Sequence, residues 1–87
     1  MHTYKTQGVC SRQITFDIID GKVHNVAYVG GCNGNLQGIG RLVEGMEVHE
    51  AIERLRGIRC GFKATSCPDQ LAQALTKALA ETTAEKN

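Results

Sequence analysis

Apolar and polar residues alternate along the first third of the chain, which is the pattern of a β-strand with one buried face. Every second position is apolar at Ile14, Phe16 and Ile18. The dipeptide Asp20-Gly21 follows, and it favours the type I′ turn that joins two antiparallel strands. A second strand is expected over about residues 22–29, where strict alternation places Val23, Asn25, Ala27 and Val29 on one face and Val26 and Tyr28 on the other. The first third therefore predicts a β-hairpin.

The rest of the chain changes to the helical period, with apolar residues three or four positions apart. Two short helices are predicted, with apolar faces formed by Leu36, Ile39 and Val43 and by Val48, Ala51, Ile52 and Leu55. Gly57 is expected to end the second helix. Pro68 and Asp69 suit the first turn of a third helix, whose buried stripe comprises Leu71, Leu75, Ala78 and Leu79. The polar tail over residues 81–87 is expected to fray.

These elements predict an α+β fold, in which an antiparallel, hairpin-based sheet carries about three helices packed on one face. The chain has 87 residues, no internal repeat and no proline-rich linker, so we expect a single domain over residues 1–87. A domain of this size buries a modest core, and a metal ion or a disulfide would help to stabilise it.

Charge and hydropathy exclude several classes of function. Ten Lys and Arg residues balance nine Asp and Glu residues, without a basic run that could follow a phosphate backbone, so nucleic acid is not expected as a partner. No apolar stretch approaches the roughly 18 residues that a membrane span needs. The N-terminus lacks a basic segment followed by an apolar one. We therefore expect a cytoplasmic protein with no membrane partner.

The cysteines are the residues with the clearest chemistry, at Cys10, Cys32, Cys60 and Cys67. In a reducing cytosol an even number of cysteines points to metal ligation or thiol chemistry more than to structural disulfides. With the predicted two-residue turn, regular pairing places Cys10 opposite Gly31 and beside Cys32. Cys67 begins the last predicted helix, where unpaired N–H groups and the helix dipole favour a thiolate. Cys60 precedes it across a short loop and is the natural fourth ligand.

The segment Thr65-Ser66-Cys67-Pro68-Asp69 spells the motif that names the TSCPD domain. The chain resembles the short, stand-alone TSCPD proteins of bacteria over nearly its whole length, with residues 31–36 and 57–61 also in register. Related domains occur at the C-terminus of adenosylcobalamin-dependent ribonucleotide reductases. The resemblance therefore implies a link to nucleotide metabolism and DNA synthesis, with a ribonucleotide reductase or another protein as partner. The barrel that carries the radical chemistry of the large enzyme has no counterpart in this chain.

The order of the elements also resembles, more weakly, the NifU-type iron-sulfur scaffold proteins. That resemblance implies three ligand cysteines, which correspond to Cys10, Cys32 and Cys67. The acidic residue that scaffold proteins place two positions after the first cysteine is Arg12 in this chain, and Cys60 is an additional thiol. These departures favour a closed site with four thiolates over a labile assembly site.

From these observations we predict a small metal-binding accessory or regulatory module that is not catalytic alone, with Zn²⁺ held by Cys10, Cys32, Cys60 and Cys67 as a structural ion. The first alternative is a redox protein that cycles either Cys60 and Cys67 or Cys10 and Cys32 between dithiol and disulfide, or, as the TSCPD resemblance implies, a subunit associated with a ribonucleoside-diphosphate reductase. The second alternative is an iron-sulfur cluster carrier.

Two other features have simpler interpretations. The glycine-rich stretch over residues 30–40 lacks the Gly-Lys-Ser/Thr ending of a phosphate-binding loop, so its glycines are expected to bend the chain around Cys32 and, at Gly38 and Gly40, to permit close helix packing. His49 is expected to be solvated, because it opens a helix with Glu50 but no second histidine follows at the spacing that a zinc hydrolase requires. His2 and His24 are expected to be solvated too, because nothing in the sequence places a carboxylate or a thiol beside them.

Overall fold

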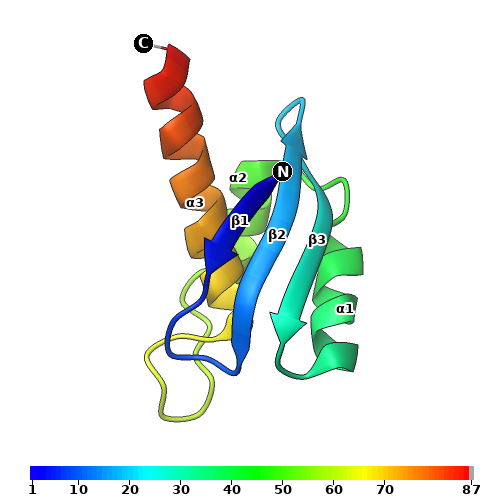
Figure 1. Ribbon diagram of the computed structural model, residues 1–87, viewed down its shortest axis with the longest axis vertical. Helices are drawn as coiled ribbons and strands as arrows, with labels where there is room; N and C mark the ends of the chain where they lie inside the picture. The colour runs from blue at the N-terminus through cyan, green and yellow to red at the C-terminus, as the bar shows by residue number, and fades with distance from the viewer. Residues whose placement is uncertain (87) are drawn as a thin grey trace.

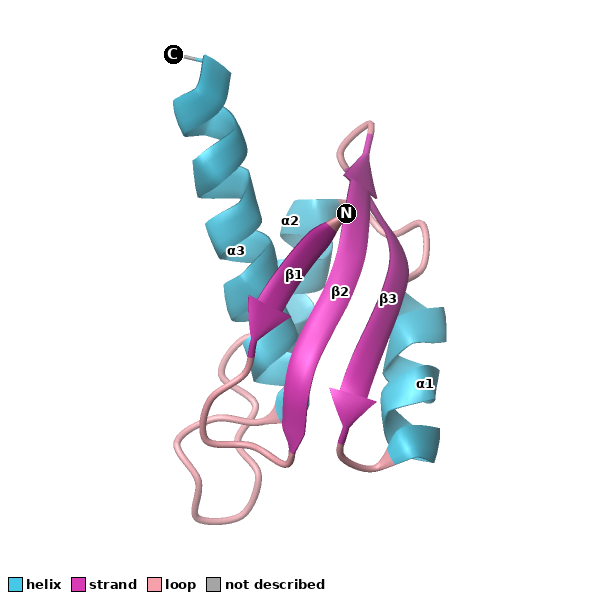
Figure 2. Ribbon diagram, viewed as in Figure 1, coloured by secondary structure: helices cyan, strands magenta, loops and turns pink. Residues whose placement is uncertain are grey.

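A three-stranded antiparallel sheet carries three helices on one face in the computed structural model, which describes the backbone of residues 1–86 and the side chains of residues 1–81 (Figure 1). The strands are β1 (His2–Lys5), β2 (Ser11–Ile19) and β3 (Lys22–Gly30), in the order β1-β2-β3. The helices are α1 (Asn33–Val43), α2 (Val48–Leu55) and α3 (Cys67–Lys86). Figure 2 shows the two layers, and the predicted α+β class is confirmed.

The predicted turn between β2 and β3 is confirmed by its backbone angles. Asp20 and Gly21 have φ values of 52° and 76°, the left-handed region that a type I′ turn requires at both central positions. The flanking residues Ile19 and Lys22 are paired, as the turn dictates.

A β-bulge in β3 changes which of its residues face the core. The pairing shifts between Thr15 and Asp17, and the extra residue on the opposite strand is Asn25, which has a φ of 57°. The bulge places Val26 and Tyr28 against the core that also contains Val23. Ala27 and Val29, which strict alternation grouped with Val23, are exposed instead. The prediction that Val23, Ala27 and Val29 share a face is therefore wrong.

Strand β1 was not predicted, because it contains only four residues and its sequence, His-Thr-Tyr-Lys, has no strong apolar alternation. It pairs antiparallel with β2, with His2 opposite Phe16. The two rings stack with centroids 5.2 Å apart, so His2 has an aromatic neighbour and is only partly exposed.

The core lies between the sheet and the helices. Its buried members are Ile14, Phe16, Val23, Val43, Val48, Ala51, Leu71, Ala74, Leu75 and Ala78. Leu79 packs partly against this cluster, so the predicted stripe of α3 is confirmed. Close packing of α1 is confirmed at Gly40, where an added Cβ would lie 2.9 Å from the Val26 carbonyl oxygen, but not at Gly38, which faces open space.

Helix α3 continues to Lys86, over most of the segment that was predicted to fray. Asn87 lies outside the described residues, and fraying stays a prediction. Among the residues that the structure describes, no helix combines the length and the apolar character needed to cross a membrane.

Candidate functional site

Three loops meet at one end of the molecule, at the lower end in Figure 1. They connect β1 to β2, β3 to α1 and α2 to α3, and each contains one cysteine, Cys10, Cys32 and Cys60 respectively. Cys67 is the first residue of α3 and follows directly from the last of these loops. The antiparallel topology thus brings all four cysteine-bearing segments to the same end of the fold.

Cys10 and Cys67 are neighbours, with their Sγ atoms 4.0 Å apart. The Ser11 hydroxyl lies 3.1 Å from the same Cys67 sulfur. Cys67 and Ser11 are buried, whereas Cys10 is exposed. The structure therefore forms a small polar cluster of two thiols and one hydroxyl that is open to solvent on the Cys10 side.

The loop between β3 and α1 passes close to this cluster. A Cβ added to Gly31 would lie 3.3 Å from the Cys10 sulfur and 2.8 Å from Cδ1 of Leu36, and the residue has a φ of 79°. A side chain at this position would be both strained and crowded. The close approach agrees with the prediction that Cys10 lies opposite Gly31, one residue before Cys32.

Residues 65–69 fix the position of Cys67 by capping the helix that it begins. The Ser66 hydroxyl accepts a hydrogen bond from the backbone N–H of Asp69 at 3.1 Å, and this identifies Ser66 as the cap. Pro68 occupies the first turn, where its missing N–H donor leaves no hydrogen bond unmade. Cys67 is thereby held at a well-defined helix start.

Asp69 anchors the loop that carries Cys60, a role that the sequence did not predict. Its carboxylate accepts hydrogen bonds from the Gly57 N–H at 2.7 Å, from the Gln73 amide at 2.9 Å and from the Thr65 hydroxyl. Burial raises the pKa of this carboxyl, but the three hydrogen bonds outweigh burial and hold the pKa below its ordinary value. Asp69 therefore holds the loop in place, in addition to its favourable position at the positive end of the helix dipole.

Gln70 is a second residue that sequence reasoning missed. Its amide oxygen accepts a hydrogen bond from the Gln7 N–H at 3.0 Å, and its amide nitrogen donates to the Thr65 hydroxyl at 3.0 Å. Gln70 is buried, and its place directly before the buried Leu71 was the available signal. The side chain connects the loop of Cys10 to the segment that precedes Cys67.

Tyr28 connects the sheet to the same helix start. Its hydroxyl donates a hydrogen bond of 3.0 Å to the Cys67 carbonyl oxygen. Burial raises the pKa of the Tyr28 hydroxyl well above its ordinary value, and Cys67 contributes in the same direction. The hydroxyl is therefore a neutral donor that fixes the backbone of Cys67.

Cys32 and Cys60 are both exposed. Cys32 occupies the cap position of α1, and its side chain makes no capping hydrogen bond. Cys60 lies in a turn closed by a hydrogen bond of 3.0 Å from the Lys63 N–H to its carbonyl oxygen. Within residues 1–81, no three or more His, Cys, Asp or Glu side chains are grouped so that they could hold a metal ion. The structure thus brings together two of the predicted ligands, and the full set of four stays a prediction.

The geometry of the Cys10–Cys67 pair fits two ligands of one zinc ion. Zinc-thiolate bonds of about 2.3 Å in a tetrahedral site place neighbouring sulfurs about 3.8 Å apart. The observed separation of 4.0 Å is close to this value. Thiolates are also the donors that soft or borderline metals prefer.

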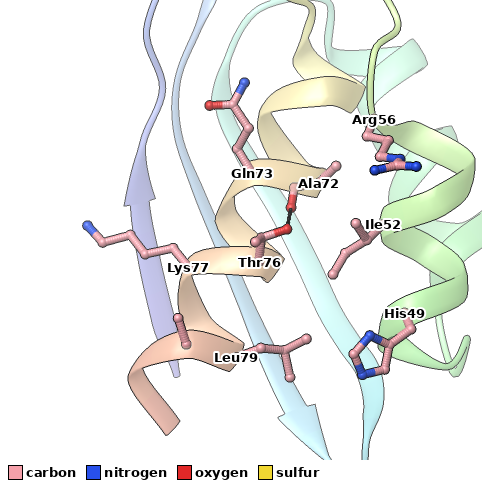
Figure 3. Close-up of a pocket in the computed structure, with 9 residues that line it drawn as sticks. His49, Ile52, Arg56, Ala72, Gln73, Thr76, Lys77 and Leu79 are labelled. Atoms are coloured by element: carbon pink, nitrogen blue, oxygen red, sulfur yellow. Dashed lines mark hydrogen bonds between the residues drawn. The ribbon is translucent and has the colours of Figure 1, made fainter. Parts of the chain in front are cut away.

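The histidines lie away from this cluster. His24, which was expected to be solvated, instead pairs with Glu44, with 2.5 Å between Nδ1 and Oε2. The contact was not predictable, because the two residues belong to different elements. His49 is exposed as predicted, at the rim of an open cavity of about 560 Å³ between α2 and α3. Figure 3 shows Ile52 and Leu79 in this cavity, which no cysteine lines.

A comparison with protein families matches the TSCPD domain to residues 2–79 of the chain. No curated protein and no solved structure matches it. The family match covers every strand, α1, α2 and most of α3, and it includes all of the cysteines.

Proposed function

Since the chain belongs to the TSCPD domain family, we propose that it is a small accessory or regulatory module whose cysteines bind one structural zinc ion. The observation that carries the proposal is the 4.0 Å separation between the Cys10 and Cys67 sulfurs, which come from opposite ends of the sequence. The convergence of the other two cysteine-bearing loops on the same end of the fold supports it (Figure 1).

Cys10 and Cys67 would provide the first two thiolates, and Cys32 and Cys60 would complete the site. The ion would supply no reaction chemistry. Its role would be to link three loops to the start of α3, which is a stabilising role in a small domain. Structural zinc contributes apparent binding free energies of about 10 to 16 kcal/mol in zinc-finger peptides. That is comparable to the whole stability expected of a domain, about 5 to 15 kcal/mol.

We further propose a protein partner in the cytoplasm, namely a ribonucleotide reductase or another protein. This part of the proposal rests on the resemblance to the TSCPD domains at the C-terminus of adenosylcobalamin-dependent ribonucleotide reductases. By this proposal the module serves nucleotide metabolism without carrying out ribonucleotide reduction itself.

Elemental analysis of protein purified without oxygen and without chelators tests the metal. We expect about one zinc per chain, a colourless solution, and release of the ion by a thiol reagent. The Cys10→Ser/Cys67→Ser double variant should lose the metal, whereas Ser11→Ala, which changes the same cluster without removing a sulfur, should keep it. A brown protein that contains iron and sulfide would show that the site holds an iron-sulfur cluster instead of zinc. Metal-free protein with four reactive thiols would overturn the proposal.

A further inference from the structure

The two neighbouring thiols differ in their access to solvent. Cys67 is 8% exposed, and its sulfur lies beside two groups, the Cys10 sulfur at 4.0 Å and the Ser11 hydroxyl at 3.1 Å. Cys10 is exposed in the loop between β1 and β2. A reagent from solution therefore reaches Cys10 first, and the nearest sulfur to the product of that reaction is Cys67.

Only one of the two sulfurs needs to move for a bond to form between them. A disulfide has an S–S distance of about 2.05 Å, so the pair must approach by roughly 2 Å. Cys67 is held by the Ser66 cap and by the hydrogen bond from Tyr28 to its carbonyl oxygen. Cys10 lies outside the strands, and a change in its side-chain rotamer can supply most of the movement.

We propose that Cys10 and Cys67 form a reversible disulfide by exchange with a low-molecular-weight disulfide. The Cys10 thiolate attacks one sulfur of the external disulfide, forms a mixed disulfide and releases one thiolate. The Cys67 thiolate then attacks the Cys10 sulfur, which forms the Cys10–Cys67 bond and releases the second thiolate. In total, the two cysteines lose two protons and two electrons, and the external disulfide becomes two thiols.

This pair differs from both pairs that the sequence suggested for redox chemistry. Cys60 lies in its own hydrogen-bonded turn between residues 60 and 65, and Cys32 occupies the cap position of α1. The sulfur–sulfur contact of 4.0 Å instead joins the residue before β2 to the first residue of α3. The consequence for the metal rests on the proposed function: the disulfide would remove two of the four thiolates, so oxidation would release the zinc ion.

Peptide mapping tests the disulfide directly, because trypsin places each cysteine on a different peptide. Cleavage after Lys and Arg gives residues 6–12, 23–41, 60–63 and 64–77. Reduced protein freed of metal by a chelator is incubated with glutathione disulfide, its free thiols are alkylated, and the digest is analysed by mass spectrometry without reduction. We expect residues 6–12 joined to residues 64–77, with the loss of two hydrogens, and separation of the two by dithiothreitol.

The Cys32→Ser/Cys60→Ser double variant should form the same link, whereas Cys10→Ser should lose it and leave Cys67 largely unmodified by glutathione. A dominant link to residues 23–41 or 60–63, or four alkylated thiols, would overturn the proposal. Failure of the two proposals can be told apart. A Cys10–Cys67 link in protein that is isolated without metal removes the zinc function and keeps the disulfide. Protein that is isolated with zinc, but forms no link after a chelator has removed the ion, does the reverse.

Discussion

The Asp69 carboxylate accepts a hydrogen bond of 2.7 Å from the backbone N–H of Gly57, which joins the first turn of α3 to the residues that follow α2. The same carboxylate binds the Thr65 hydroxyl. One buried side chain therefore fixes both ends of the loop that carries Cys60. Within the segment 65–69, Asp69 and Thr65 share this structural role, because they are hydrogen-bonded to each other.

Substitution Asp69→Asn removes the charge while keeping the shape of the side chain. A hydrogen bond to a charged group contributes about 1.5 to 3 kcal/mol, and an amide cannot accept three donors as well as a carboxylate does. We expect the free energy of unfolding to fall by about that amount at neutral pH, measured by urea denaturation. Asp20→Asn is the control, because Asp20 is exposed in a turn that asparagine tolerates, and it should be near neutral.

The effect of Asp69→Asn should depend on pH. The folded-state pKa of Asp69 lies below its ordinary value of 3.8, so its stabilising contribution is fully present above the unfolded pKa and is lost as the pH falls through the folded pKa. The difference in unfolding free energy between parent and variant should therefore be largest near neutral pH and shrink below about pH 4. A difference that is unchanged at acid pH would contradict this account.

Substitution by alanine should change the stability of the protein in opposite directions at two glycines of α1. An added Cβ at Gly38 meets nothing within 4 Å, so Gly38→Ala should stabilise the protein by about 0.5 to 1 kcal/mol through helix propensity. At Gly40 the Cβ would lie 2.9 Å from the Val26 carbonyl oxygen, so Gly40→Ala should destabilise by about 1 to 3 kcal/mol. Thermal melts compare the two variants. Equal effects would show that α1 does not approach β3 as closely as described.

Removal of Cys67 should be more severe than removal of Cys60. Cys67 is buried beside Cys10 at a capped helix start, whereas Cys60 is exposed in a separate turn. If zinc is bound, Cys67→Ser should lower the melting temperature and weaken metal retention more than Cys60→Ser, because metal binding is coupled to folding.

The melts are run under reducing conditions, with and without added zinc. A purely redox role predicts a different result, since serine would abolish disulfide formation and leave the reduced fold nearly as stable as before. A Cys67→Ser variant that melts within about a degree of the parent in zinc would exclude a structural metal, because losing one ligand of such a site costs several kcal/mol.

The isolated chain should not reduce ribonucleotides. Under the proposed link to ribonucleotide reductases, the chain corresponds to a TSCPD domain alone, and the 87 residues contain no counterpart of the barrel that carries radical chemistry in those enzymes. An assay with ribonucleotides, adenosylcobalamin and a dithiol reductant should give no deoxyribonucleotide above a control without protein. Turnover by the pure chain would refute the accessory role.

The hairpin and the helix stripes could be predicted because each depends on nearby residues. Asp20-Gly21 determines the turn, and the apolar spacing in α3 identifies its buried face. The bulge at Asn25 was missed because strict alternation was assumed along β3, although two successive polar residues, His24 and Asn25, interrupt the alternation and asparagine tolerates the left-handed backbone. Strand β1 has too few apolar residues to be recognised without its partner strand.

The candidate site was predicted in part. The sequence identified the cysteines and the start of α3 at Cys67, because both follow from residue type and local spacing. It did not identify the Cys10–Cys67 contact or the hydrogen bond from the Gln7 N–H to Gln70, since these join residues 57 and 63 positions apart in the chain. Contacts of that kind depend on how α3 packs against the sheet.

The two register shifts of the hairpin determine where the protein could lose a residue. The first adds Asn25 to β3, and the second, between Ser11 and Gln13, adds a residue to β2 and restores the original pairing at Gly30. Deletion of a single residue at either bulge would leave the pairing on both sides unchanged, whereas deletion elsewhere in the strands would turn the following core residues toward solvent. Changes in the length of this hairpin should therefore be confined to these two points, and deletion at either of them would leave Cys10 beside Gly31.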